Sequence, residues 1–289
     1  MRVSVTCVAA AAVALIPASV GAAEPPLVPD PGIRVPDATN PTAALDASGR
    51  VQLHYESRVG GGQRVAYSED GLTFGVGAPD DPTTDVRGVR LHGNVWRRYR
   101  FDPRTLVLRS DSSRDGKTYV PDSGVRYRPA PVDRGKFGIH TVFADKTKRG
   151  RTIRGVVLLY IGDLMGLNNV RRAYSRDNGW TFRYERGNVM GDADAGGGPN
   201  SFVDQKVIER PDGTLRLYCM RMGTIYRFVS RDGGTTFKRE SGVVLSPAAF
   251  GAVSLHDPWP VRLPSGIERI YIAAHFEGER FAIVSATAR

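Results

Sequence analysis

Short runs in which apolar and polar residues alternate follow one another along the chain. Runs such as QRVAYS (63–68), NVRRAYS (169–175) and TIYRFVS (224–230) are rich in aromatic and β-branched residues, and each ends at a serine. A glycine turn and a second strand-like run follow each of them, so each pair predicts a β-hairpin. Because no stretch carries a convincing helical pattern, the sequence predicts an all-β protein.

The turns between these runs repeat. They read SEDGLTF (68–74), SRDGKTY (113–119), SRDNGWTF (175–182) and SRDGGTTF (230–237), and we call them the Asp turns. An Asp in a tight turn accepts backbone N–H bonds from the residues just ahead of it, and the Gly supplies a positive φ. The final aromatic residue anchors the turn from below. We therefore predict that the turn aspartates are structural: Asp70, Asp115, Asp177 and Asp232.

A second repeat precedes the hairpins. The segments 40–49, 204–213 and 257–266 each run ten residues from Asn or Asp to a turn Gly, and a strand-like run follows each. The serines of the Asp turns, Ser68, Ser113, Ser175 and Ser230, are spaced by 45, 62 and 55 residues, and 55 more reach Ser285. This spacing predicts a β-propeller with four antiparallel strands per blade.

Five blades of about 53 residues would fill the chain after residue 23, and six would need unusually short repeats. The last repeat ends one strand short, so we expect residues 26–37 to supply the missing strand and close the ring. We interpret residues 24–289 as one propeller domain. Residues 1–23, with an early Arg2, an apolar stretch and small residues before Glu24, read as a cleaved signal peptide, which predicts a secreted or periplasmic protein.

At this point the chain resembles a known superfamily. The repeated S-x-D-x-G-x-T-F/W strings resemble the Asp-box (BNR) repeats of sialidases, and the runs that begin with DP resemble the five-bladed glycoside hydrolases of families 43 and 32. The resemblance implies a β-propeller that acts on glycans. It also implies that Arg34 in RVP holds a substrate carboxylate, and that ESR (56–58) corresponds to the next sialidase motif. The sialidase acid Asp is missing from the following loop, and Asn40 stands where family 43 has its general base.

In a propeller the innermost strands begin on the top face, and the loops between second and third strands return to it. The strand starts offer Asp37, Asn40, His140, Asn200, Asp204, His256 and Asp257, and the loops offer Glu56, Arg58, Asp163, Arg221, His275, Glu277 and Glu279. Asp204 and Asp257 begin equivalent strands, so they are our candidate catalytic carboxylates. The alternative is that each caps its own strand.

Other top-face residues are candidates for substrate contact. His256 stands beside Asp257, and His140 lies near another strand start, so either could line the channel or pack as an ordinary hydrogen-bonding group. Trp259 could stack on a sugar or belong to the core. Arg58 and Arg221 each lie nine or ten residues before an Asp-turn serine. They could grip an acidic sugar bidentately, or form salt bridges to neighbouring blades.

Composition narrows the partners. The net charge is +10, and Cys219 is the only cysteine after the signal segment, so no internal disulfide is expected. A basic exported protein is attracted to anionic partners, although scattered basic residues argue against nucleic acid. DADAG (192–196) only weakly resembles a calcium loop, and we expect no cofactor, no membrane span and a monomer. Two functions remain: a glycoside hydrolase, and a non-catalytic propeller that binds a glycan or a surface.

Overall fold

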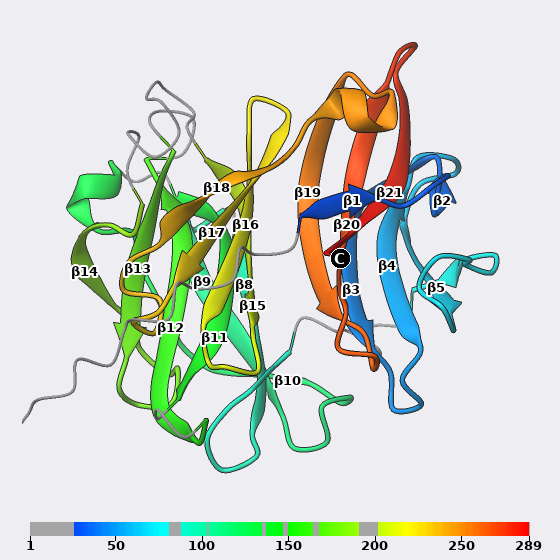
Figure 1. The fold of residues 1–289 in the computed structure, drawn as a ribbon. Helices are drawn as coiled ribbons and strands as arrows, with labels where there is room; N and C mark the ends of the chain where they lie inside the picture. Colours follow the sequence, from blue (N-terminus) through cyan, green and yellow to red (C-terminus); the bar gives the residue numbers. More distant parts are fainter. Residues whose placement is uncertain are drawn as a thin grey trace, which may run out of the picture.

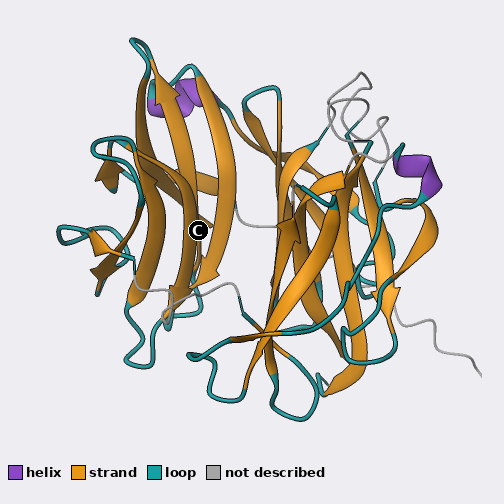
Figure 2. Cartoon of the chain, turned by 180° about the vertical axis from the view of Figure 1, so that it is seen from behind, coloured by secondary structure: helices purple, strands orange, loops and turns teal. Residues whose placement is uncertain are grey.

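Strands of the chain pair into five antiparallel sheets, which follow one another around a ring (Figures 1 and 2). Four sheets have four strands, and the fifth has four strands and the two-residue β2 (Val35–Pro36). The structure is a computed structural model, and it describes residues 26–80, 88–102, 104–134, 137–146, 150–163, 168–190 and 202–288. The predicted five-bladed propeller is confirmed, and the six-bladed alternative is wrong. Outside the strands, the described residues form two short 3-10 turns, Pro131–Asp133 and Pro247–Phe250.

The strands are bounded as follows. Blade 1 contains β3 (Ala38–Leu45), β4 (Val51–Ser57), β5 (Gln63–Ser68) and β6 (Ala78–Pro79). Blade 2 contains β7 (Val89–Arg90), β8 (Trp96–Asp102), β9 (Val107–Ser113) and β10 (Val120–Pro121). Blade 3 contains β11 (Phe137–Lys146), β12 (Thr152–Gly162), β13 (Asn169–Ser175) and β14 (Arg183–Asn188). Blade 4 contains β15 (Val203–Glu209), β16 (Leu215–Arg221), β17 (Thr224–Ser230) and β18 (Lys238–Leu245). Blade 5 contains β19 (Ser254–Arg262), β20 (Glu268–Phe276), β21 (Arg280–Ala288) and β1 (Leu27–Pro29).

The core lies between blades. The described residues form four buried apolar clusters, at the interfaces of blades 2 and 3, 3 and 4, 4 and 5, and 5 and 1. Successive residues of β12 face different clusters: Leu158 belongs to the cluster with blade 2, and Leu159 to the cluster with blade 4. Because both faces of this strand are covered, it reads as an unbroken apolar run, VVLLYI, instead of an alternating one.

The N-terminal segment closes the ring, as predicted. β1 pairs antiparallel with β21, with Leu27 opposite Ala288, and β2 (Val35–Pro36) pairs with the other end of β21. Between them, the buried Asp30 accepts hydrogen bonds from Ser285 Oγ and Thr287 Oγ1, both at 2.8 Å, and pairs with Arg269 at 3.2 Å. The closure is therefore held by a buried carboxylate as well as by strand pairing.

The same arrangement occurs in blade 2. Asp122 follows β10, accepts bonds from Ser110 and Ser112 at 2.6 and 2.9 Å, and pairs with Arg97 at 3.3 Å. The sequences agree as well, since VPDPGIR (28–34) and VPDSGVR (120–126) differ at two positions. This repeat is a signal for the fourth strand of blade 5 that the serine count does not use.

The count to Ser285 is wrong in register. Ser230 lies opposite Leu215, the first residue of β16, whereas Ser285 lies opposite Tyr271, three residues into β20. Ser285 instead corresponds to Ser110, because each serine binds the aspartate of its VPD segment. Blade 5 therefore continues past the position that the 55-residue spacing of the Asp-turn serines assigns to the end of its third strand.

The Asp turns join third and fourth strands, at the end of the blades opposite the inner-strand starts. Asp70 accepts the N–H groups of Leu72 and Thr73, both at 2.8 Å, and Asp177 accepts the N–H and hydroxyl of Thr181 at 2.9 and 2.6 Å. Asp115 and Asp232 accept equivalent backbone bonds. The geometry of all four is that of the predicted turn staples.

Each of two Asp turns is also bound by the preceding blade in the ring. Tyr271 Oη donates to Gly71 O at 2.8 Å, and Arg269 Nη1 donates to Asp70 O at 2.7 Å. Blade 2 repeats this on the turn of blade 3, where Tyr99 Oη donates to Gly179 O at 3.2 Å. These bonds lock blade 5 to blade 1 and blade 2 to blade 3.

Candidate functional site

Bulges at the starts of the inner strands build the site. In β3, β15 and β19, two residues lie opposite one residue of the second strand. The first bulged residue is Asn40, Asp204 or Asp257, with φ of 52°, 57° and 49°. Asn and Asp tolerate this left-handed conformation better than other residues with a Cβ. Ile139 occupies the matching register in β11.

These bulges connect neighbouring blades around the axis. The backbone N–H of Asn40 donates to the carboxylate of Asp257, and the backbone N–H of Asp257 donates to the carboxylate of Asp204. Asp204 and Asp257 are therefore brought together, as expected from their equivalent positions. The structure also shows that each carboxylate takes a backbone donor from the next blade, so it caps a neighbouring bulge and not its own.

Both aspartates have raised pKa values. Burial is the largest cause, and it raises the pKa of Asp257 to about 7, with the charge of Asp204 adding to the effect. Burial also raises the pKa of Asp204, while the Lys206 ammonium lowers the pKa of both carboxyls. Two close carboxylates that resist joint ionisation titrate as a pair, which here keeps a proton close to neutral pH.

Glu56 and Asn40 stand beside the pair. Asn40 Nδ2 donates to Glu56 Oε2 at 2.7 Å, and both side chains are exposed. The charge of Glu56 adds a small increase to the pKa of Asp257. Blade 1 thus contributes an amide at the position where blades 4 and 5 contribute carboxylates, and its own carboxylate comes from the neighbouring strand β4.

Lys206 was not among the sequence candidates. Its Nζ lies 4.9 Å from the centre of the Trp259 ring and donates to His140 O at 3.4 Å. The signal for it was present, because Lys206 follows Asp204 by two residues, as Trp259 follows Asp257. Lys206 therefore connects the aspartate pair with two residues predicted to line the channel.

A cavity of about 620 Å³ lies beside Lys206 and Trp259. It is lined by residues of blades 2 to 5: Gly88, Val89, Tyr99, Arg100, Phe101, His140, Thr141, Val142, Lys206, Val207 and Trp259. His140 Nε2 contacts Tyr99 O at 3.1 Å, and Trp259 Nε1 donates to Ala43 O at 2.8 Å. His140 and Trp259 thus line the channel, and both also make the packing contacts that were the alternative.

His256 pairs with a serine. Ser254 Oγ and His256 Nε2 are 2.7 Å apart on β19, and the imidazole is half-buried. Burial lowers the pKa of His256, although the charge of Asp204 opposes this effect. Burial and the charge of Asp204 thus act on His256 in opposite directions, and burial is the larger effect.

Three side chains, Arg58, Phe281 and His275, stack on one another where strands of blades 1 and 5 end, and we call this place the rim. Arg58 Cζ lies 4.8 Å from the centre of the Phe281 ring, and Phe281 stacks on His275 with 4.5 Å between ring centres and an angle of 9°. Arg58 is exposed, just after β4, and Arg221 is the half-buried last residue of β16. Both arginines do lie at the ends of second strands.

Arg58 and Arg221 are not equivalent, however. Arg221 pairs with Thr224, and the residue in the same register of blade 1 is Ser57, one before Arg58. A shift of one residue in a strand turns a side chain to the other face. Their matched spacing in the sequence therefore does not correspond to matched positions.

Arg34 lies elsewhere. Its guanidinium donates to Leu72 O at 2.7 Å and to Gly32 O at 2.7 Å, and it is buried beside the Asp turn of blade 1. Burial lowers its pKa. The structure thus does not bring Arg34 together with Asp204 and Asp257, because VPDPGIR folds as an outer fourth strand and not as a top-face loop.

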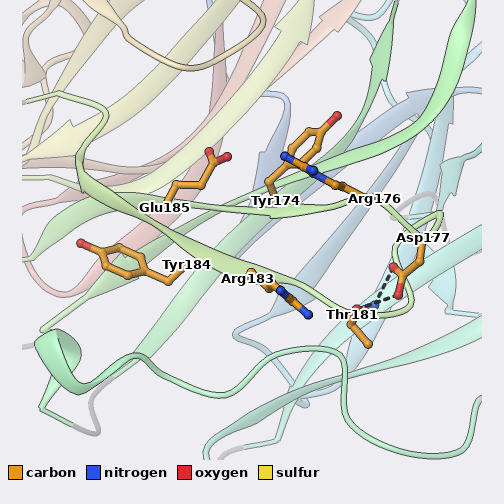
Figure 3. Close-up of a pocket in the computed structure, with 7 residues that line it drawn as sticks. All are labelled: Tyr174, Arg176, Asp177, Thr181, Arg183, Tyr184 and Glu185. Atoms are coloured by element: carbon orange, nitrogen blue, oxygen red, sulfur yellow. Dashed lines mark hydrogen bonds between the residues drawn. The ribbon is translucent and has the colours of Figure 1, made fainter.

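A separate hollow of about 490 Å³ lies at the outer edge of blade 3 (Figure 3). It contains Tyr174, Arg176, Asp177, Thr181, Arg183, Tyr184 and Glu185. Its Asp177 is bound to Thr181 within the Asp turn, as the dashed lines show. None of the predicted catalytic residues belongs to it, so we place the candidate site at the axis.

Two sequence candidates lie outside the described residues, namely Asn200 and the segment 192–196 that weakly resembles a calcium loop. Among the residues that are described, no group of His, Cys, Asp and Glu side chains could hold a metal ion. The same part of the chain contains no helix with the length and apolar character to span a membrane.

Comparison with known proteins gives the fold. No family model matches the chain, and no curated protein is significantly similar to it. The catalytic domain of a family 62 α-L-arabinofuranosidase from Coprinopsis cinerea superposes with a TM-score of 0.63 at 12% identity, covering 92% of this chain and 95% of that one. A Podospora anserina α-L-arabinofuranosidase gives 0.59 at 13%, covering 91% and 94%. An endo-arabinase from Bacteroides thetaiotaomicron gives 0.57 at 14%, covering 89% and 97%. At these identities the similarity shows a shared propeller fold.

Proposed function

We propose that this protein is a glycoside hydrolase whose active site is the top of the axial channel. The observation that carries the proposal is the adjacent pair Asp204 and Asp257, which is held by backbone donors from neighbouring blades and keeps a proton close to neutral pH. Glycosidases generally need one protonated and one ionised carboxyl across the scissile bond. The shared fold with arabinofuranosidases and an arabinanase supports the same assignment.

The two carboxyls have different roles. Asp257 has the pKa of about 7, so it is the general acid that protonates the glycosidic oxygen. Lys206 and His256 both act to lower the pKa of Asp204, whereas the charge of Asp204 itself raises that of Asp257. Asp204 is therefore the ionised group that attacks the anomeric carbon or activates water.

The enzyme is sialidase-like or exo-acting, so its substrate is a terminal sugar, and we propose an acidic one. Arg58 supports this assignment, because its exposed guanidinium sits on the Phe281–His275 stack at the rim. Guanidinium groups bind carboxylates bidentately. Arg58→Ala and Arg221→Ala should weaken binding of acidic glycans more than of neutral ones, and equal losses would contradict a carboxylate-reading rim.

The test of catalysis is conservative substitution. Asp204→Asn and Asp257→Asn should each lower turnover of aryl sialosides, arabinosides or fructosides by at least about 100-fold, since each removes an acid–base group. Circular dichroism should be unchanged. An active wild type whose two variants both stay active would place the chemistry elsewhere, with Asp37, Glu56 and Asp163 next to test.

A second function is favoured by one observation. Asn40 presents an amide at the bulge where blades 4 and 5 present carboxylates, and it is hydrogen-bonded to Glu56. Such a site suits a non-catalytic propeller that binds a glycan or a surface. A wild type that is retained on a glycan array but inactive on the whole substrate panel would select this function.

We also propose that the protein is exported and monomeric. The apolar N-terminal stretch motivates the first proposal, and protein found only inside cells, with residues 1–23 retained, would contradict it. Light scattering after size-exclusion chromatography tests the second, which a dimer mass would overturn.

A further inference from the structure

Trp180 occupies an unusual position in the Asp turn of blade 3. Its side chain is 42% exposed, whereas Trp96 and Trp259 are half-buried. A large exposed aromatic ring is costly to leave in water unless it packs against something else. The ring lies on the face opposite the axial site, since the Asp turns and inner-strand starts are at opposite ends of the blades.

The buried side of the indole rests on two arginines. Arg97 Cζ lies 4.0 Å and Arg126 Cζ 4.8 Å from the ring centre, and both arginines are buried, at 1% and 5% exposure. Arg97 is further fixed by Asp122 at 3.3 Å and by Asn178 O at 2.6 Å. Because the indole covers both guanidinium groups, the exposed part of the side chain faces outward.

The chain contains its own comparison for this contact. At the interface of blades 5 and 1, Arg269 and Arg34 take the places of Arg97 and Arg126, and both are buried beside the Asp turn. The turn residue that corresponds to Trp180 there is Leu72. A leucine thus suffices at the equivalent turn, and packing alone does not demand the indole of Trp180.

A groove of about 530 Å³ adjoins the ring. The residues that line it between blades 2 and 3 include Arg97, Arg114, Thr118, Val120 and Trp180. Arg114, Thr118 and Val120 are exposed within it. Its size suits a small ligand, and it combines a flat aromatic surface with hydroxyl and guanidinium groups at the side.

We propose that this groove binds a segment of a polysaccharide, with the apolar C–H face of one sugar ring stacked on Trp180 and its hydroxyls directed to Thr118 and Arg114. The choice of a glycan as ligand rests on the proposed function. The site itself is separate from the axial one, and it holds the polymer on the opposite face while the axial carboxyls act on a chain end.

Affinity electrophoresis of the full protein tests this, in native gels that contain arabinoxylan, linear arabinan or polygalacturonate. Wild type should be retarded in at least one gel. Trp180→Leu, which copies Leu72, should bind that polymer about tenfold more weakly, a loss of about 1.4 kcal/mol, and Trp180→Phe should fall in between. Leu72→Ala, at the matched turn, should leave the retardation unchanged. A melting temperature of Trp180→Leu close to wild type shows that the leucine still covers the arginines.

The outcomes separate this site from the axial one. Trp180→Leu should turn over short aryl glycosides like wild type, and Asp257→Asn should still be retarded in the gel. If wild type turns over none of the aryl glycosides, and its retardation in the gel is lost in Trp180→Leu, only the hydrolase proposal would be overturned. Retardation that survives Trp180→Leu, or a wild type retarded by none of the three polymers, would overturn the groove site. So would a wild-type dimer that Trp180→Leu converts to a monomer, because the groove would then bind a second copy.

Discussion

At the scale of the residue, the same carboxyl group behaves in opposite ways at the two ends of the blades. In the Asp turn of blade 1, the backbone N–H groups of Thr73 and Leu72 hold the pKa of Asp70 at about 2. At the axis, burial and the neighbouring Asp204 raise the pKa of Asp257 to about 7. Donors that favour the charged form suit a structural role, and desolvation that favours the neutral form suits an acid.

The turn aspartates should matter for stability alone. Asp177→Ala or Asp232→Ala removes the acceptor of two or more turn bonds, which should cost about 1–3 kcal/mol of unfolding free energy. Urea unfolding measures the loss, and glycan specificity should not change. A variant that kept its melting temperature and lost activity would show that the Asp turn takes part in function.

The depressed pKa of Asp70 also predicts an acid limb of stability. A carboxyl with a lower pKa in the folded state stabilises the fold above its unfolded pKa of about 3.9. That contribution is lost as the pH falls through about 2. As the pH decreases from about 3.9 to about 2, the unfolding free energy of wild type should therefore fall more steeply than that of Asp70→Asn. Parallel plots of unfolding free energy against pH for the two proteins would contradict this assignment.

Lys206 should set the pH range of activity. Its ammonium lowers the pKa of both Asp204 and Asp257, so Lys206→Met should raise both values. Both limbs of a bell-shaped pH profile of kcat/KM should then move to higher pH, and Lys206→Arg should restore them. A lower activity without any shift would mean that Lys206 only packs against Trp259.

At the scale of the element, the glycine of an Asp turn does more than permit a positive φ. A Cβ on Gly71 would lie 2.6 Å from Arg269 Nη1 and 2.8 Å from Tyr271 Oη, both on blade 5. The turn must therefore be free of a side chain for the neighbouring blade to dock. The Asp turn of blade 1 is thus both a hairpin connection and half of a contact between blades.

This can be separated from backbone strain. Gly71 and Gly213 have φ of 69° and 80°, but a Cβ on Gly213 would have nothing within 4 Å. Gly213→Ala should cost about 1–2 kcal/mol for the left-handed backbone, and Gly71→Ala should cost about 1–3 kcal/mol more because of the clash. Equal losses in thermal unfolding would show that the docking contact is not tight.

The sequence predicts the strands and turns of this protein better than it predicts which side chains from different blades lie in contact. The Asp turns, the blade number and the closing strand follow from repeats, because each blade obeys the same local rules. Asp204 and Asp257 follow from equivalent register. Arg34 was placed with the substrate by its RVP motif, although its VPDxGxR repeat marks an outer strand. Lys206 was missed because its contacts, Trp259 and His140, come from other blades, and so does the contact of Phe281 with Arg58; no local pattern records them.

At the scale of the whole molecule, the ring of blades is closed by the pairing of the N-terminal segment with β21. Asp30 ties the N-terminal segment to β21 through Ser285 and Thr287, and to β20 through Arg269. Its counterpart Asp122 makes the same kind of contacts within blade 2, where chain connectivity already holds the strands together. The two aspartate sites are therefore chemically alike, but the Asp30 site joins the N-terminal segment to the last blade, whereas the Asp122 site joins strands that are already neighbours in the chain.

Asp30→Asn should open the ring and Asp122→Asn should not. Each leaves a buried arginine without its carboxylate, at a cost of about 3–5 kcal/mol. Limited proteolysis should release the N-terminal segment of Asp30→Asn much faster than that of Asp122→Asn at equal distance below the melting temperature. Similar rates of release would mean that the strand pairing of β1 and β2 is enough.

The closing strand also fixes an order of events. β1 is synthesised first but pairs with β21, which is synthesised last, so that Leu27 must wait for Ala288. Individual blades can form from local hairpins while the chain is still growing, whereas closure needs contacts across almost its full length. A nascent chain therefore carries an unpaired β1 until β21 emerges, and blade 5, with Asp257, is the last part of the axial site to be completed.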